Sequence, residues 1–229
     1  MIFISPTCIL TGREALAGRE GRLPSDQGPF MLIDCGANAD CRPEMLLQFA
    51  HMGSIYVSHM FADKKTPRVG LLNVGTEDTK GGELQHATFP LLKESGLNFI
   101  GNIEARDVPA GVADVVVADG FNGNILLKTL EGTVDMLMKN LKSALMSSLR
   151  TKIGAMLVMP AMRVIKKKLS ASEHGGAVLL GVNRPVVKAH GNANAKAIAS
   201  AVRVAAEFAE SGVVEEIAAV SGKKEDVAE

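Results

Sequence analysis

Short apolar runs alternate along the chain with longer segments in which apolar residues recur at helical spacing. The runs have the length of β-strands, and polar segments that contain glycine follow several of them. Such alternation predicts an α/β fold with a largely parallel sheet. We expect strands at residues 30–34, 68–74, 97–100, 114–118 and 185–188.

Helical spacing predicts four helices between and after these strands. They cover residues 43–61, residues 83–94, a long apolar stripe from Leu126 to Leu145, and residues 192–210. No repeat or linker interrupts the pattern, so we expect one domain over residues 1–229. Within it, residues 220–229 should form a flexible tail.

The charge balance narrows the choice of partners. Lys and Arg together number 25, as do Asp and Glu, and this neutral balance argues against a nucleic-acid partner. Cys8, Cys35 and Cys41 fit neither a disulfide framework nor a metal site, and the histidines show no metal-ligand spacing. No run approaches the roughly 18 apolar residues of a membrane span. We therefore expect a cytoplasmic protein without a metal.

Polar loops follow three of the predicted strands, at residues 34–38, 73–82 and 119–124. Because the carboxyl ends of parallel strands share one edge of a sheet, these loops should converge on one crevice. Glycine lets the backbone approach a ligand, and the start of a helix attracts anions. Residues 122–124 are thus predicted to hold a phosphate-like group. An ordinary turn in which an asparagine caps the helix explains the same residues equally well.

Two basic residues at loops are candidates for chemistry. Lys80 is the only basic residue of the loop at 75–82, where it would neutralise a phosphate or an oxyanion. The alternative is an exposed lysine on a mobile loop. His190 lies between the strand at 185–188 and the next helix. It could act as an acid/base group, and the alternative is a buried, hydrogen-bonded histidine.

An apolar run at residues 153–162 contains Pro160 and precedes a basic cluster. Such a pattern predicts contact with a membrane surface, or a helix pair in a dimer interface. The residues expected to touch the membrane are Ala155, Met156, Leu157, Val158 and Met159.

Four segments taken together resemble the phosphate acyltransferase family over about residues 13–210. They are DCGANADCRPEMLLQFAHMGSIY, RVGLLNVGTEDTKGGELQHATFPLLKESGLNFIGNIEARDV, ADVVVADGFNGNILLKTLEGT and GGAVLLGV…PVVKAHGNANAKAI. The resemblance implies a three-layer α/β/α fold with a mostly parallel sheet, like isocitrate and isopropylmalate dehydrogenases and phosphotransacetylases. It also implies a homodimer, no cofactor, and a protruding helical hairpin at about 126–169 that touches the membrane.

The reaction implied by this resemblance converts acyl-carrier-protein thioester and inorganic phosphate to acyl phosphate, at the entry to phospholipid synthesis. The family's catalytic lysine matches Lys80 in GTEDTKG, and its catalytic asparagine matches Asn124 in GFNGN. The partners implied are acyl carrier protein, phosphate, the inner face of the membrane and the glycerol-phosphate acyltransferase of the next step. Residues expected to bind phosphate or substrate are Asp119, Gly120, Asn122, Gly123 and His190.

Family members usually carry a further N-terminal region with a DAMGGD-type strand and an SAGNTGA-type loop, and neither motif is present here. The chain therefore resembles an N-terminally truncated member. Two alternatives to the acyl-carrier-protein reaction remain open at this stage. One is an inactive remnant that binds only a membrane or a partner subunit, and the other is a phosphotransacetylase that uses coenzyme A thioesters.

Overall fold

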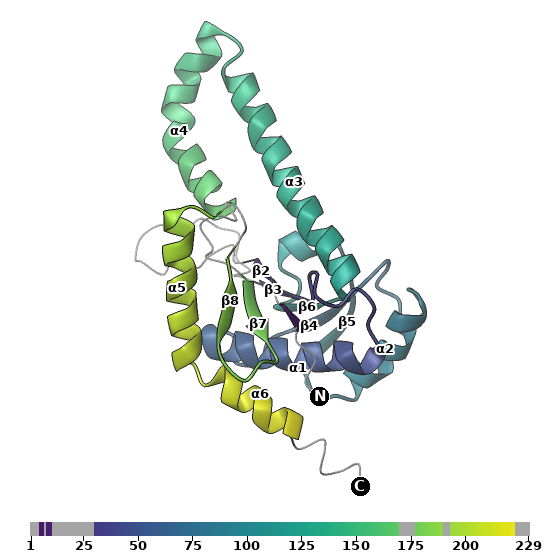
Figure 1. Ribbon diagram of the computed structural model, residues 1–229. Helices are drawn as coiled ribbons and strands as arrows, with labels where there is room; N and C mark the ends of the chain where they lie inside the picture. Colours follow the sequence, from purple (N-terminus) through teal and green to yellow (C-terminus); the bar gives the residue numbers. More distant parts are fainter. Residues whose placement is uncertain (1–4, 7, 11–29, 170–176, 190–192, 223–229) are drawn as a thin grey trace.

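The computed structural model describes residues 5–6, 8–10, 30–169, 177–189 and 193–222, and Figure 1 shows the arrangement of their elements. The strands are β1 (Ser5–Pro6), β2 (Cys8–Leu10), β3 (Phe30–Ile33), β4 (Val69–Asn73), β5 (Phe99–Glu104), β6 (Val115–Val117), β7 (Ala177–Leu180) and β8 (Val186–Lys188). The helices are α1 (Pro43–Met60), α2 (Glu83–Lys93), the short 3-10 helix η2 (Val108–Ala110), α3 (Gly120–Leu145), α4 (Leu149–Leu169), α5 (Ala195–Glu210) and α6 (Val213–Gly222).

A five-stranded sheet with the order β2-β3-β6-β4-β5 forms the centre of the fold. β3, β6, β4 and β5 are parallel, and only β2 runs antiparallel to its neighbour. Val117 of β6 pairs with Ile33 on one side and with Leu71 on the other, so β6 is the central strand. The expected mostly parallel sheet is confirmed.

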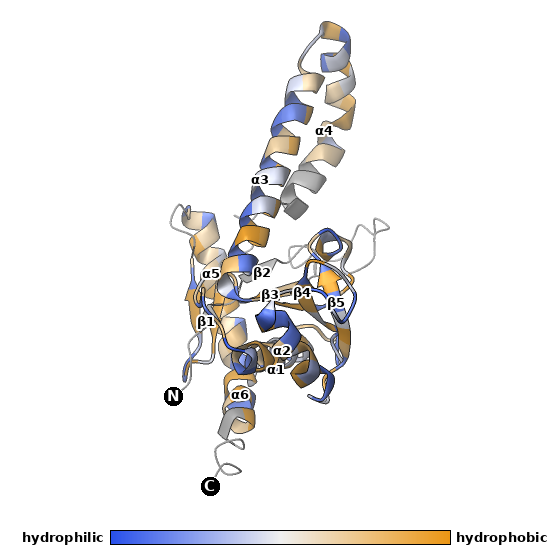
Figure 2. Cartoon of the chain, turned by 90° about the vertical axis from the view of Figure 1, so that its right-hand side faces the viewer, coloured by the Kyte–Doolittle hydropathy of each residue, from blue (hydrophilic) through white to orange (hydrophobic). Residues whose placement is uncertain are grey.

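β3 and β6 are apolar throughout because both faces of this sheet are covered. Successive side chains point to opposite faces. Ile33 and Val117 pack in one core with α1, whereas Leu32 and Val116 pack on the other face with Leu126 of α3. Figure 2 shows the apolar strands between these layers. The three-layer α/β/α arrangement is confirmed.

A second, three-stranded sheet was not predicted. Its order is β1-β7-β8, and both pairings are antiparallel. Val178 and Leu180 of β7 join the same core as Phe208 of α5, whose ring lies 5.8 Å from that of Tyr56 on α1. The two sheets therefore share one hydrophobic core.

Two predicted boundaries are wrong. The strand expected at 97–100 is β5, which runs from Phe99 to Glu104. A bulge at Gly101 (φ 94°) interrupts its pairing with β4, and the pairing then continues through the polar residues Asn102 and Glu104. α6 continues to Gly222, so residues 220–222 of the expected tail are helical. The rest of that tail, 223–229, lies outside the described residues.

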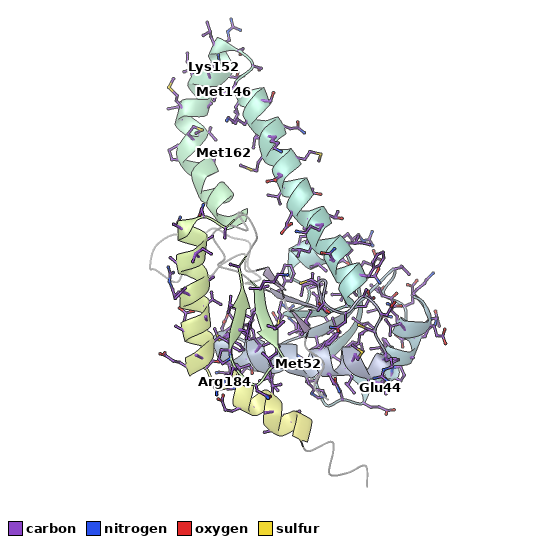
Figure 3. All side chains as sticks on the ribbon, viewed as in Figure 1. Glu44, Met52, Met146, Lys152, Met162 and Arg184 are labelled. Atoms are coloured by element: carbon purple, nitrogen blue, oxygen red, sulfur yellow. The ribbon has the colours of Figure 1, made fainter. Side chains whose placement is uncertain are left out.

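α3 and α4 form a hairpin that projects from the body, and we call it the arm (Figure 1). The expected hairpin is present, but α3 begins at Gly120 rather than near Leu126. Pro160 lies inside α4 without ending it. The turn of the arm is at Met146–Ser148, and Figure 3 shows Met146 and Lys152 at its far end with Met162 farther down α4.

Candidate active site

Three polar loops leave neighbouring strands at one edge of the parallel sheet. They follow β3, β6 and β4, which are adjacent in the strand order. The backbone hydrogen bonds between β3 and β6 continue past the ends of these strands. Asp34 N donates to Ala118 O (2.9 Å), and Ala118 N donates to Ile33 O (2.8 Å). The topology therefore places the three loops at one edge of the sheet, and their convergence on one crevice stays a prediction.

The first loop is folded around the buried carboxylate of Asp34. Its Oδ1 accepts hydrogen bonds from the backbone N–H groups of Gly36 (3.0 Å) and Ala37 (3.1 Å). Its Oδ2 accepts from the backbone N (2.8 Å) and the side-chain Nδ2 (2.9 Å) of Asn38. These four bonds fix the loop as a tight turn beside the start of α3.

The two glycines at the start of α3 allow the helix to touch this turn. Gly120 N donates to Asn38 O (2.7 Å), and a Cβ atom at Gly120 would lie 2.7 Å from the same oxygen. A Cβ atom at Gly123 would overlap the carbonyl oxygen of Asp34. Both glycines are thus required for close packing of backbone against backbone.

Asp119 caps α3, so the alternative of an ordinary turn with an asparagine as the cap is wrong about the capping residue. Its carboxylate accepts from the backbone N of Asn122 (2.8 Å) and from the Asn122 Nδ2 (2.6 Å). The positive end of the helix dipole therefore faces a carboxylate of the protein itself. In this structure the side chain of Asn122 holds Asp119 in place.

Asn124 is exposed and lies one turn into α3. Its amide lies over the first loop: a Cβ atom at Gly36 (φ 138°) would be 3.7 Å from the Asn124 Oδ1. Asn124 is therefore the polar side chain of this helix start that faces the loop edge and remains open to solvent.

Three side chains donate hydrogen bonds to carbonyl groups of the loop that carries Lys80. Asn73 Nδ2 bonds Lys80 O (2.9 Å), Asn102 Nδ2 bonds Glu77 O (2.9 Å), and His86 Nε2 lies 2.8 Å from Thr79 O. These bonds hold the loop to β4, β5 and α2 and argue against the mobile-loop alternative.

The side chain of Lys80 itself is exposed. A Cβ atom at Gly75 would lie 3.0 Å from the Lys80 Cγ, so this glycine makes room for the stem of the lysine. A well-held backbone that carries an exposed ammonium group is suited to bind an anion at the sheet edge.

Cys41 is half-buried next to the first loop. Its Sγ donates to Asn38 O (3.3 Å), and burial raises the pKa of the thiol to about 11. The thiol is therefore protonated at neutral pH and is a poor nucleophile. Cys35 is also half-buried, and the side chain of Cys8 lies outside the described residues.

The apolar residues of the arm are exposed near its turn. Leu149, Ile153 and Leu157 lie at helical spacing on α4 and are 80%, 62% and 82% exposed, and Met156 and Met146 extend this surface. We call these five residues the tip surface. The basic residues Arg150 and Lys152 are exposed beside it. Within the described parts of the chain, no helix is long and apolar enough to cross a membrane.

The expected membrane-touching segment 155–159 is partly corrected. Met156 and Leu157 belong to the tip surface, and Val158 and Met159 are partly exposed, but Ala155 is buried. A helix that packs against a neighbour cannot present five consecutive residues to solvent.

Sequence reasoning missed the residues that hold the site together. Asp34, His86 and Asn102 were not candidates, although each of them bonds a loop of the site. The position of Asp34 immediately after a buried strand was the available signal. Asn102 and His86 carried no signal, because their contacts depend on the strand order and on the placement of α2. His190 lies outside the described residues.

Comparison with known proteins places this arrangement in a structural class. The fold is similar to that of a phosphotransacetylase from Staphylococcus aureus, EutD, with a TM-score of 0.51 and 17% sequence identity. The match covers 90% of this chain and 54% of the other. The fold is thus of the phosphotransacetylase type.

Sequence comparison is more specific. Residues 13–216 match the model of the family described as "Fatty acid synthesis protein", and the chain belongs to this family. It is 55% identical over 196 residues to a phosphate acyltransferase of Lysinibacillus sphaericus and 46% identical over 195 residues to that of Clostridium novyi. Each match covers 85% of this chain but only 59% and 58% of the relative. The chain therefore spans about three-fifths of the length of these relatives.

Proposed function

We propose that this chain carries the anion-binding and acyl-transfer site of a phosphate acyltransferase. The observation that supports this most is the Lys80 loop, which is held to the sheet by three side chains and follows β4, the neighbour of β6. β6 leads into α3 and Asn124. Lys80 and Asn124 therefore come from adjacent positions at the sheet edge where α/β folds bind ligands.

The reaction is the attack of an inorganic phosphate oxygen on the thioester carbonyl of acyl-acyl carrier protein. A carbon–oxygen bond forms, and a tetrahedral oxyanion results. The oxyanion collapses, the carbon–sulfur bond breaks, and the carrier leaves as a thiolate that takes up a proton. Because phosphate is the nucleophile, the protein needs to supply only positioning and charge stabilisation.

In this mechanism Lys80 neutralises the phosphate or the oxyanion, and Asn124 donates an amide hydrogen bond to one of them. Asp119, Gly120, Asn122 and Gly123 set the position of Asn124, through the helix cap and the backbone contact with the first loop. His190 is proposed as a further substrate-binding residue at the start of the segment that leads to α5.

The resemblance to phosphate acyltransferases supports acyl carrier protein as the acyl donor. The phosphotransacetylase-type fold makes coenzyme A thioester the competing donor, because both donors end in a thiol. The two donors can be compared in one assay, in which a phosphate acyltransferase should prefer the acyl carrier protein thioester and a phosphotransacetylase the coenzyme A thioester.

The test is phosphate-dependent thiol release from palmitoyl-acyl carrier protein and from palmitoyl-coenzyme A. Lys80→Ala should reduce the rate by about 10²–10³-fold, as loss of one oxyanion-stabilising group does. The matched control is Lys93→Ala, which removes an exposed lysine at the far end of α2 and should keep the wild-type rate. Undiminished turnover in folded Lys80→Ala would exclude the lysine from the mechanism. Absence of turnover in the wild-type chain would favour a non-catalytic remnant.

We further propose that the enzyme works as a homodimer in the cytoplasm, with its arm against the inner face of the membrane. The tip surface and the adjacent Arg150 and Lys152 support this proposal, since apolar and basic side chains together suit an anionic bilayer surface. Acyl phosphate would then form close to the glycerol-phosphate acyltransferase that consumes it.

A further inference from the structure

Asn102 is a buried polar residue on β5 that the mechanism above does not use. It is 5% exposed and pairs with Leu71 of β4 in the sheet. Its Nδ2 donates to Glu77 O at 2.9 Å. Its Oδ1 is buried and has no hydrogen-bond partner in the described part of the chain.

The orientation of this amide is set by its one hydrogen bond. Rotating the amide by 180° would place Oδ1 against the carbonyl oxygen of Glu77, and two acceptors cannot form a hydrogen bond. The unpaired atom is therefore the oxygen. Burial of an unpaired carbonyl oxygen destabilises a fold, so an apolar residue at this position would favour stability.

The carbonyl group that accepts the hydrogen bond of Asn102 also accepts one from the backbone of Lys80. Glu77 O accepts from the Asn102 Nδ2 and also from the backbone N of Lys80, at 3.0 Å. Asn73 binds the carbonyl group of the same lysine at 2.9 Å. The backbone of Lys80 is thus held at its carbonyl group by β4 and at its N–H group, through Glu77, by β5.

We propose that Asn102 is a positioning residue for Lys80. Its Nδ2 fixes the Glu77 carbonyl group and with it the turn that carries the lysine, and its unpaired oxygen is the energetic cost of placing that donor inside the sheet. The effect on turnover rests on the proposed acyl transfer, whereas the effect on the loop does not.

The test compares Asn102→Leu and Asn102→Ala with Asn98→Leu and Asn98→Ala. Asn98 is the control, because this exposed asparagine immediately precedes β5 and its Nδ2 donates to a carbonyl group away from the Lys80 loop, that of Thr66 (3.1 Å). Hydrogen exchange at the backbone N–H of Lys80 is the first readout. Loss of one hydrogen bond should speed this exchange about tenfold in the Asn102 variants and leave it unchanged in the Asn98 variants.

The second readout is steady-state turnover. Misplacing a charged group by a fraction of an ångström should lower kcat about 10–100-fold with little change in KM for the thioester. Thermal unfolding should show that Asn102→Leu is at least as stable as the wild-type chain, because the unpaired oxygen is gone.

Unchanged exchange at Lys80 in both folded Asn102 variants would overturn the proposal. Faster exchange spread over all of β4 and β5, together with a lower melting temperature, would also overturn it, since that pattern indicates a purely structural residue. If the wild-type chain lacks turnover, the proposed function fails, and the exchange at Lys80 still decides the role of Asn102.

Discussion

Gly123 lies so close to Asp34 that no side chain fits between them. The overlap would be with a backbone carbonyl oxygen, which belongs to a loop tied by four hydrogen bonds and has little freedom to move. The glycine-rich seam between β6 and α3 is thus explained first by packing. The same packing sets where Asn124 lies.

Gly123→Ala should therefore push α3 away from the first loop. We expect a loss of about 3 kcal/mol in the free energy of unfolding, at the upper end of the usual cost of overpacking. Urea unfolding followed by circular dichroism measures it.

Gly132→Ala is the matched control, because Gly132 lies on the same helix with no neighbouring atom within 4 Å of its Cβ position. This variant should be more stable by up to about 1 kcal/mol, as alanine favours helix. Equal effects of the two substitutions would contradict the packing role of Gly123.

At the scale of the elements, the apolar runs predicted β3, β4 and β6 and their loops because buried parallel strands are apolar on both faces. β5 was shifted because its carboxyl half is polar, and its bulge is not visible in a hydrophobicity pattern. β7 was missed because a short run such as Ala177–Leu180 fits a strand or a buried helix equally well.

The candidate site, like the fold, was predictable from the sequence only in part. Lys80 and Asn124 stand out in glycine-containing loops, and the motifs that resemble phosphate acyltransferases add their roles. Asp119 as the cap was missed although aspartate is a preferred residue before a helix and its bond reaches only Asn122, three residues on. Asn102 as a support was not predictable, because its bond to Glu77 depends on how β5 and the loop meet in three dimensions.

The arm is an element whose apolar surface has no covering partner within the described residues. Leu157→Glu should weaken binding to vesicles of phosphatidylglycerol and phosphatidylcholine at least about tenfold, because it places a charge where the exposed leucine would enter the bilayer surface. Co-sedimentation with the vesicles measures the binding.

The control for the arm is Val202→Glu, which places the same charge on an exposed apolar residue of α5. It should bind the vesicles as the wild-type chain does. Equal binding of Leu157→Glu and the wild-type chain would show that the tip surface does not touch the membrane.

At the scale of the whole molecule, Asp114 joins the amino ends of β6 and β4. Its carboxylate accepts from the Arg68 backbone N (2.8 Å) and Nε (3.0 Å) and forms an ion pair with Lys64. Burial raises the pKa of Asp114, but the hydrogen bonds from Arg68 and Lys64 outweigh burial and lower it from 3.8 to about 2.

A pKa that is lower in the folded state stabilises the fold at pH values above about 4, and this contribution is lost as the pH falls towards 2. The loss should be about 2 kcal/mol. Urea unfolding measures the free energy of unfolding, which should decline between pH 6 and pH 2. In Asp114→Asn this decline should be smaller by about 2 kcal/mol than in the wild-type chain. Asp63→Asn, which changes an exposed aspartate, should show the same decline as the wild-type chain. The same decline in Asp114→Asn would contradict the stabilising role of the Asp114 carboxylate.

The length of α3 has a consequence for phosphate at a charged membrane. An α-helix rises about 1.5 Å per residue, so Asn124 lies up to about 30 Å from the far end of the arm. Electrostatic screening in physiological salt acts over about 8 Å. When the arm rests on an anionic bilayer, the site therefore stands several screening lengths away, where the negative headgroups no longer repel an incoming dianion. Under the proposed function, the arm would thus let acyl phosphate form near a lipid surface without lowering the phosphate concentration at the site.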